Sequence, residues 1–271
     1  MIINNKFSVS NDDRFCLIAG PCVIESEEQV LKTARELKDI TERHDIDLIF
    51  KSSFDKANRS SINSYRGPGM SRGLEILQNV KDKYNLPVIT DFHVPEQAAP
   101  VAEVVDALQI PAFLSRQTNI LLAAGKTGLP INVKKGQFLS AEGMDNVINK
   151  IESTGNEQIM LCERGAMFGY NNLVVDMRNL DIMKELGKPV VFDTTHSVQR
   201  PGAHGDSSGG DRRFAPSLAR AAIGVGVAGI FAEVHPDPSS AKCDAATQLP
   251  LDEFESHVEQ WKAIDETIKH D

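Results

Sequence analysis

The sequence lacks the features typical of membrane, secreted and nucleic-acid-binding proteins. No stretch approaches the ~20 consecutive apolar residues that a membrane helix needs. The first residues show no basic segment followed by an apolar one, so we expect no secretory signal. Basic residues number 29 against 38 acidic ones, and the formal net charge of −9 disfavours binding to nucleic acids or anionic membranes.

Cysteines are scarce and widely spaced. The four of them, Cys16, Cys22, Cys162 and Cys243, form no C-x-x-C pair. This spacing favours free thiols in a reducing compartment, and we therefore expect a cytoplasmic protein. Cys16 and Cys162 fall within apolar runs and are interpreted as structural.

Short runs rich in β-branched residues alternate with helical patterns. Eight strands are predicted, at residues 15–20, 47–53, 87–93, 104–112, 130–135, 158–164, 189–196 and 229–236. Helices are predicted at residues 26–43, 70–84, 95–103, 117–127, 142–154, 178–187, 214–226 and 252–269. Ser26 followed by Gln29 indicates a capping box at the first helix. Eight strand–helix units in about 250 residues predict an α/β fold, a (β/α)8 TIM barrel, over a doubly wound sheet.

No break in composition divides the chain, so a single (β/α)8 barrel domain is predicted over residues 1–271. Residues 1–13 are expected to form an N-terminal extension, a hairpin over the barrel bottom. The Gly- and Ser-rich residues 201–211 are expected to form a mobile loop that closes over a substrate. Residues 224–229 match G-x-G-x-x-G, but they end a predicted helix instead of opening one. We therefore expect no nucleotide or other organic cofactor.

Unusual polar residues follow the ends of all eight predicted strands, which is where TIM barrels carry their active sites. In chain order they are Cys22, Lys51, Ser53, Lys56, Asn58, Arg59, Ser60, Asp91, His93, Gln109, Arg116, Lys134, Lys135, Gln137, Glu163, Arg164, Asp193, His196, Glu233, His235 and Asp244. Charges scattered over a surface would not gather at one end of eight strands, so we predict an active site there.

One subset of these residues is cationic, within an acidic protein. It comprises Lys51, Lys56, Arg59, Arg116, Lys134 and Arg164. Arginine forks and lysine point charges bind phosphate, so two phosphorylated small molecules would fit this charge. The alternative is that several of these cations pair with nearby acids, namely Asp55, Asp91, Glu163 and Asp193.

A second subset, Cys22, His196, Glu233 and Asp244, offers a mixed ligand set for a divalent metal such as Zn2+, Fe2+ or Mn2+. Barrel closure places their strands side by side, which favours this interpretation. The alternatives are that Cys22 is a packed core thiol or that it is a nucleophile. Cys243 beside Asp244 could be structural or functional.

Several segments together resemble one enzyme family. They are IAGPCVIES, FKSSFDKANRSSINSYRGPG, TDFH, QIPAFLSRQT, NVKKGQF, RGAMFGYNNLVVDMR, FDTTHSVQRPG and AEVHPDP with CDAATQLPL. In order, from about residue 15 to 251, they resemble 3-deoxy-D-manno-octulosonate 8-phosphate synthases. KANRSS separates this family from the similar 3-deoxy-D-arabino-heptulosonate 7-phosphate synthases, which act on erythrose 4-phosphate.

The resemblance implies an aldol-type condensation of phosphoenolpyruvate with D-arabinose 5-phosphate and water, for the inner core of lipopolysaccharide. It implies a catalytic set of Lys56, Asn58, Asp91 and His196. Phosphoenolpyruvate is expected at Lys51, Ser53, Lys56, Gln109, Lys134 and Arg164. Arabinose 5-phosphate is expected at Asn58, Arg59, Ser60, Asp91 and, from a neighbouring subunit of a homotetramer, Arg116.

The resemblance also bears on the metal, because the family divides at the position of Cys22. Metal-dependent members carry Cys there and metal-independent members carry Asn, so a divalent ion (Zn2+, Fe2+, Mn2+ or Co2+) is expected at Cys22, His196, Glu233 and Asp244. Cys243 departs from this branch and resembles the metal-independent one. Two alternatives remain: a 3-deoxy-D-arabino-heptulosonate 7-phosphate synthase acting on erythrose 4-phosphate and, from another functional class, a non-catalytic sugar-phosphate-binding barrel.

Overall fold

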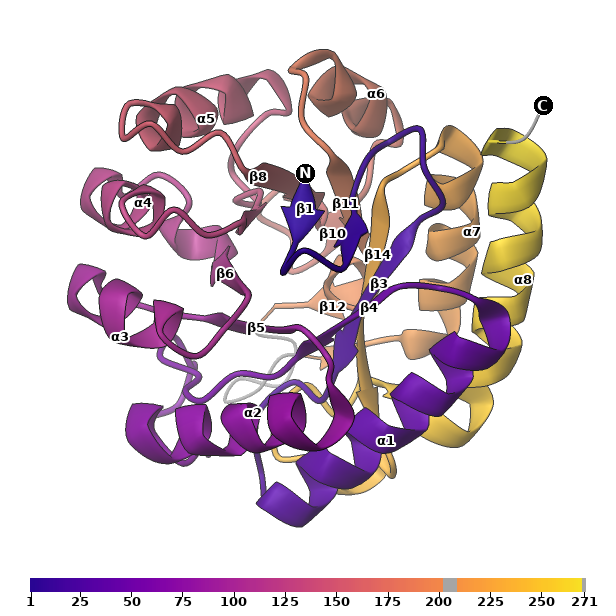
Figure 1. Ribbon diagram of the computed structural model, residues 1–271. Helices are drawn as coiled ribbons and strands as arrows, with labels where there is room; N and C mark the ends of the chain where they lie inside the picture. The colour runs from indigo at the N-terminus through magenta and orange to yellow at the C-terminus, as the bar shows by residue number, and fades with distance from the viewer. Residues whose placement is uncertain (202–208, 270–271) are drawn as a thin grey trace.

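Eight parallel strands close into a barrel in the computed structural model, which describes residues 1–201 and 209–269. The strands are β3 (Cys16–Gly20), β4 (Leu48–Lys51), β5 (Val88–Asp91), β6 (Ala107–Ile110), β7 (Ile131–Lys134), β8 (Ile159–Glu163), β11 (Val190–Asp193) and β14 (Gly229–His235). Each pairs with the next in chain order, and β14 pairs with both β11 and β3 to close the ring (Figure 1). Every strand lies inside its predicted run, and the TIM barrel is confirmed.

Among the described residues, eight α-helices surround the barrel (Figure 1). They are α1 (Glu27–His44), α2 (Met70–Tyr84), α3 (Ala98–Ala102), α4 (Thr118–Gly125), α5 (Asp145–Glu152), α6 (Arg178–Glu185), α7 (Ala215–Val225) and α8 (Leu251–Lys269). The helices predicted at 95–103 and 142–154 begin as 3-10 turns, η1 (Pro95–Gln97) and η3 (Glu142–Met144). Further 3-10 turns are η2 (Ala112–Leu114), η4 (His196–Val198), η5 (Arg212–Phe214) and η6 (Pro238–Ser240).

Helix α1 shows how the outer layer forms. Val30, Ala34 and Leu37 recur at helical spacing and are fully buried against the strands. Ser26 caps the helix, since its Oγ accepts the N–H of Gln29 at 3.2 Å. The side chain of Gln29 has no hydrogen-bond partner among the described residues, so only half of the predicted capping box forms.

The expected N-terminal hairpin is present, with β1 (Ile2–Ile3) antiparallel to β2 (Phe7–Ser8). It lies across one end of the barrel in Figure 1. Ile3 is buried against the apolar side chains that fill the barrel interior, including Cys16 and Cys162. Both of these thiols are structural, and burial raises the pKa of each to about 12.

Short strand pairs complete the fold. β9 (Ala166–Met167) pairs with β10 (Leu173–Val174), and β15 (Leu249–Pro250) pairs in parallel with the end of β14. β12 (Gln199–Arg200) pairs with β13 (Gly209–Gly210), and the loop predicted at 201–211 falls largely on residues 202–208, outside the described residues. The G-x-G-x-x-G segment ends α7 as predicted, with Gly226 as a left-handed cap.

Gly20 brings the first two strand ends close together. A Cβ at this position would lie 2.0 Å from the main-chain oxygen of Lys51, so only glycine permits the approach. Cys22 follows two residues later, and its carbonyl accepts a hydrogen bond from the Lys51 ammonium at 3.1 Å.

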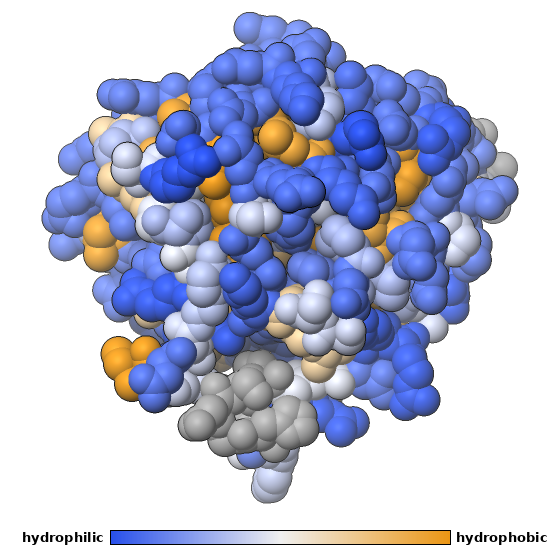
Figure 2. All heavy atoms as spheres, turned by 90° about the horizontal axis from the view of Figure 1, so that it is seen from below, coloured by the Kyte–Doolittle hydropathy of each residue, from blue (hydrophilic) through white to orange (hydrophobic). Residues whose placement is uncertain are grey.

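The outer surface is predominantly polar in the view of Figure 2, with apolar side chains in small, separate groups. Among the described helices, none combines the length and apolar character that crossing a membrane requires.

Candidate active site

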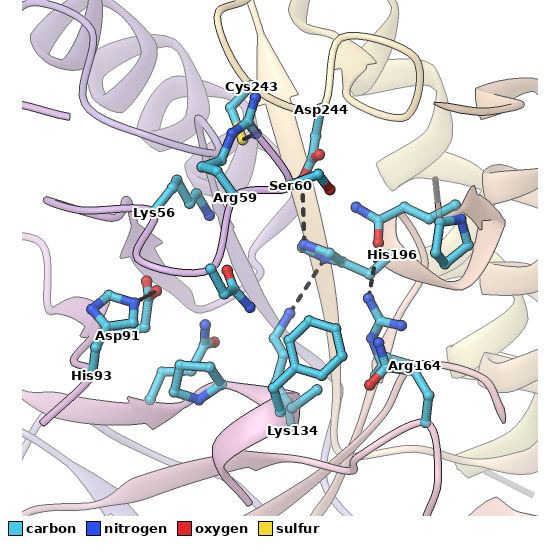
Figure 3. Close-up of a pocket in the computed structure, with 18 of the residues that line it drawn as sticks. Lys56, Arg59, Ser60, Asp91, His93, Lys134, Arg164, His196, Cys243 and Asp244 are labelled. Atoms are coloured by element: carbon cyan, nitrogen blue, oxygen red, sulfur yellow. Dashed lines mark hydrogen bonds and ion pairs between the residues drawn. The ribbon is translucent and has the colours of Figure 1, made fainter. Parts of the chain in front are cut away.

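A cavity opens at the carboxyl end of the barrel strands (Figure 3). Its lining includes most of the residues predicted for the site: Lys51, Lys56, Asn58, Arg59, Ser60, Asp91, Gln109, Lys134, Arg164, His196 and Asp244. Cations from several strand ends therefore converge on one space, as the sequence predicts. The lining also contains His93, Gln137, Gln199, Cys243 and Phe113.

Glu233, at the end of β14, is a fully buried anion beside two of these cations. Its Oε1 lies 3.1 Å from Lys51 Nζ and 3.7 Å from Lys56 Nζ. Burial alone would raise the pKa of Glu233, but the charges of His196 and Lys51 outweigh it and hold the pKa well below its usual range. Glu233 is therefore ionised at neutral pH.

Asp193, at the end of β11, plays the same role for Lys134 and His196. It pairs with Lys134 Nζ and lies 2.7 Å from His196 Nδ1, and its other oxygen accepts the main-chain N–H of His196 at 2.9 Å. The charges of His196 and Lys134 overcome burial and hold the Asp193 pKa well below its usual range. The carboxylate thus orients the imidazole so that Nε2 faces the cavity (Figure 3).

The alternative that cations pair with acids is thus partly correct: of the four acids named, Asp193 pairs with a cation of this set. Lys134 does pair with Asp193, whereas Lys51 and Lys56 pair with Glu233. Asp55 pairs with Arg66. Glu163 lies 3.5 Å from Lys135 and accepts main-chain N–H groups of the turn that follows it.

Arg164 is the clearest unsatisfied cation in the cavity. It is 4% exposed, and its NH2 donates to Gln199 Oε1 at 2.9 Å. Its Nε and NH1 are buried with no hydrogen-bond partner among the described residues. Burial lowers the pKa of this guanidinium from its ordinary value, although the charge of Asp193 opposes the shift. Two unmet donors on one fork suit an anion such as phosphate or carboxylate.

Asp91 forms the opposite wall. Its two oxygens accept Ser53 Oγ and pair with His93 Nε2, the latter at 3.1 Å. Burial alone would raise the Asp91 pKa, but the hydrogen bond from His93 and the charge of Lys56 hold it well below its usual range. Ser53 is fully buried behind this carboxylate and does not belong to the cavity lining.

The loop that follows β4 carries Lys56, Asn58, Arg59 and Ser60 into the cavity. Burial opposes the charge on Lys56, yet Cys22 and Glu233 beside it hold the Lys56 pKa well above its usual value.

Arg116 does not belong to this cavity. Its side chain is exposed and lies outside the cavity lining, and its main-chain oxygen accepts Lys150 Nζ at 3.2 Å.

The residues predicted to bind metal gather in two overlapping groups. The donor atoms of His196, Glu233 and Asp244 lie within 4.8 Å of one another. Those of Cys22, Cys243 and Asp244 do so as well, and Cys22 Sγ is 3.5 Å from Asp244 Oδ2. Asp244 belongs to both groups and so connects the four predicted ligands. Cys243 is a fifth donor that was not predicted.

The donor set fits a divalent ion. Imidazole, carboxylate and thiol are the ligands that zinc and its neighbours take. The Oε2 atom of Glu233 is buried without a hydrogen-bond partner among the described residues, a costly state that a bound cation would relieve. Burial raises the Cys22 pKa well above its usual value, with Cys243 adding to the shift, so this thiol is neutral without a cation.

Sequence reasoning missed Gln199, which orients Arg164, and Phe113, which lines the cavity and is half exposed. The signal for Gln199 was its position three residues after the predicted strand at 189–196, inside HSVQRPG.

Comparisons with known proteins agree with this geometry. A model of the DAHP synthetase I family matches residues 1–270. The 2-dehydro-3-deoxyphosphooctonate aldolase of Francisella tularensis subsp. holarctica (strain LVS) is 56% identical over 264 residues, 97% of this chain and 96% of that protein. Proteins of the same name from Shewanella amazonensis (52% over 262 residues, 97% and 93%) and Desulfatibacillum aliphaticivorans (56% over 262 residues, 97% and 96%) are also similar.

The substitution Asp193→Asn should destabilise the protein in a pH-dependent way. At pH 7 the free energy of unfolding should fall by roughly 3–5 kcal/mol, because Lys134 becomes a buried charge without its partner. Because the pKa of Asp193 is lower in the folded protein, its carboxylate stabilises the fold at pH values above about 3.9, the pKa of an unfolded aspartate. This contribution is lost as the pH falls below that value. Urea unfolding from pH 7 to pH 3 would measure the effect.

The difference between variant and parent should therefore shrink as the pH falls below about 4. Asp12→Asn is the matched control, since Asp12 is exposed and should change stability by less than about 0.5 kcal/mol. A difference that stays constant down to pH 3 would contradict this account of Asp193.

Proposed function

Because the chain belongs to the DAHP synthetase I family, we propose that it catalyses the reaction for which its relatives within that family are named. The chain is an enzyme with 3-deoxy-D-manno-octulosonate 8-phosphate synthase (2-dehydro-3-deoxyphosphooctonate aldolase) activity. Phosphoenolpyruvate, D-arabinose 5-phosphate and water give the eight-carbon sugar acid phosphate and inorganic phosphate. The product serves lipopolysaccharide inner-core biosynthesis.

Identity above 50% over nearly the whole chain carries this conclusion, and the cavity agrees with it chemically. Arg164 offers two nitrogen donors, Nε and NH1, that have no hydrogen-bond partner among the described residues, and three lysines converge nearby. A cavity this cationic inside an acidic protein requires anionic ligands. Two phosphorylated substrates meet that requirement.

For phosphoenolpyruvate we propose the side of the cavity formed by Lys51, Lys56, Gln109, Lys134 and Arg164. The free Nε and NH1 of Arg164 would bind one anionic group, and Lys134 would bind the other as a point charge. Ser53 would act indirectly, since its hydroxyl is donated to Asp91 behind the cavity wall.

For arabinose 5-phosphate we propose the loop with Asn58, Arg59 and Ser60, opposite Asp91. Asp91 is an ionised acceptor suited to sugar hydroxyls, and Asn58 can both donate and accept. The protonated ammonium of Lys56 lies between the two sides. It would polarise the aldehyde and protonate the alkoxide that forms there.

The chemistry then follows from positioning. C3 of phosphoenolpyruvate attacks the aldehyde carbon, C2 becomes electron-deficient, and water adds to C2. The resulting tetrahedral intermediate expels phosphate by C–O cleavage. Holding both substrates in one cavity removes the entropy cost of their encounter, which is worth ~7–11 kcal/mol of the barrier. His196, oriented by Asp193, faces this region and can hold a proton at Nε2.

We propose further that the protein is of the metal-dependent type, with Cys22, His196, Glu233 and Asp244 as the ligands. The clustering of their donor atoms and the unpartnered Glu233 Oε2 support this proposal. A bound divalent ion would act as a Lewis acid, orienting the aldehyde or lowering the pKa of water.

We also propose a homotetramer in which Arg116 completes the pentose phosphate site of a neighbour. Arg116 lies outside the cavity of its own chain, and exposed apolar residues occupy loops at the same end of the barrel. Among these are Phe113, Phe138, Met167 and Phe168. A second copy would cover them and bring its own Arg116 to the site.

A phosphate-release assay with purified protein tests the activity. Phosphoenolpyruvate with arabinose 5-phosphate should release phosphate, and erythrose 4-phosphate should be a poor replacement. Arg164→Lys should raise KM for phosphoenolpyruvate about 10- to 100-fold, since a charged hydrogen bond is worth roughly 1.5–3 kcal/mol. KM for arabinose 5-phosphate should change little.

Arg178→Lys is the control, because Arg178 is exposed and pairs with Asp176 at the surface. Efficient turnover of erythrose 4-phosphate would assign the seven-carbon synthase instead. Binding of both ligands with no phosphate released would contradict the enzymatic assignment.

The metal proposal is tested by chelation. Treatment with a strong chelator should abolish activity, and Mn2+, Fe2+, Co2+ or Zn2+ should restore it. Cys22→Asn should retain activity after chelation if asparagine substitutes for the metal as in the other branch of the family. Full activity in protein shown by elemental analysis to be metal-free would refute the proposal.

The shared site is tested by mixing subunits. Arg116→Ala should weaken arabinose 5-phosphate binding and Lys56→Ala should abolish turnover, each in its own homo-oligomer. Mixed oligomers should regain activity, because some sites then combine an intact Lys56 with an intact Arg116 from a neighbour. Arg35→Ala, an exposed helix substitution, is the control for mixing. No recovery in verified hetero-oligomers would place Arg116 outside the shared site.

A further inference from the structure

Cys243 lies in the active-site region with no role in the reaction described above. It lines the cavity, although it is only 3% exposed, and it forms a small buried cluster with Cys22 and Val23. Its Sγ lies within 4.8 Å of both Cys22 Sγ and a carboxylate oxygen of Asp244. Two thiols and a carboxylate thus surround one point, beside His196 and Glu233, the other two donors already assigned.

The backbone explains how two adjacent residues can both face this point. Neighbouring side chains in an extended chain point in opposite directions, which would send the side chains of Cys243 and Asp244 apart. Asp244 instead adopts the left-handed region, with φ of +47°, and the chain turns sharply there. The turn directs both side chains toward Cys22.

Gln248 holds the two thiols at a defined separation. Its Oε1 accepts the main-chain N–H of Cys22 at 3.1 Å, and its Nε2 donates to the main-chain oxygen of Cys243 at 2.8 Å. Gln248 is 1% exposed, so water does not compete for these bonds. This buried amide bonds to the backbones of both cysteines. It therefore restricts the movement of the loop that carries Cys243 and favours one arrangement of the two thiols.

We propose that Cys243 is a second thiolate ligand, which makes this a two-sulfur site that prefers thiophilic ions such as Zn2+, Cd2+ or Co2+ over Mn2+. The inference rests on the metal-dependent function proposed above. A zinc–sulfur bond is about 2.3 Å, so two sulfurs on one ion lie at most about 4.6 Å apart. The observed arrangement needs only a small adjustment of either side chain to meet that limit.

Arg59 connects this ligand to the substrate loop. Its NH1 donates to Cys243 Sγ at 2.7 Å. Sulfur is a weak acceptor, and a phosphate oxygen binds a guanidinium far more strongly. Arrival of the pentose phosphate would therefore draw Arg59 away and leave Cys243 Sγ free for the metal.

The experiment compares the cobalt-loaded wild-type protein with Cys243→Ser and Cys22→Ser. Sulfur-to-cobalt charge-transfer absorption scales with the number of thiolate ligands, so each variant should lose about half of the wild-type intensity. Chelator competition should show at least about tenfold weaker Zn2+ and Cd2+ binding in Cys243→Ser, with Mn2+ binding little changed, because manganese gains little from sulfur. Cys162→Ala, a thiol of the barrel interior, is the matched control and should behave as wild type.

X-ray absorption of the zinc-loaded wild type provides a measurement that needs no variant, and two sulfur neighbours at about 2.3 Å are expected. Two results would overturn the assignment of Cys243 as a ligand and leave the metal site itself intact. One is a single sulfur neighbour in the X-ray absorption data. The other is unchanged cobalt absorption in Cys243→Ser while Cys22→Ser loses all of it. No sulfur-to-metal absorption in any of the proteins would overturn the proposed metal site as well.

Discussion

Two buried carboxylates, Asp193 and Glu233, allow several positive charges to share one cavity. Lys134 and His196 contact Asp193, and Lys51 contacts Glu233, so each cation is neutralised from behind. Without these anions, desolvation and mutual repulsion would force the lysines to lose their protons or leave the interior. The same attraction to neighbouring cations holds the pKa values of both acids below their usual range.

The barrel makes this arrangement possible because it places β11, β14 and β3 side by side. The carboxylate of Glu233 therefore lies between Lys51, from β4, and His196, from the turn after β11. One oxygen is occupied by lysine and the other remains unpartnered among the described residues. Glu233 thus neutralises the charge of lysines that are proposed to bind substrate, and it also faces the proposed metal site. This single side chain couples the two functions.

Much of the fold could be predicted, because its signals are local. Strand runs, helical spacing and the N-cap at Ser26 depend on residues within a few positions of one another, and the structure confirms them. The site was predicted less completely. Ser53 lies behind Asp91 instead of lining the cavity, Gln29 does not close its half of the capping box, and Gln199 orients Arg164 without any charge to reveal it.

The barrel, the end of it that carries chemistry and the family can be inferred from the amino-acid sequence, since hydrophobic periodicity and ordered motifs are properties of the chain. Only the tertiary structure decided which acid neutralises which cation and that Cys243 lies beside Cys22. These two residues are far apart in the chain and meet because β3 and β14 pair and Gln248 joins the backbones that follow. Such contacts depend on distances of a few ångströms between side chains, which linear order does not specify.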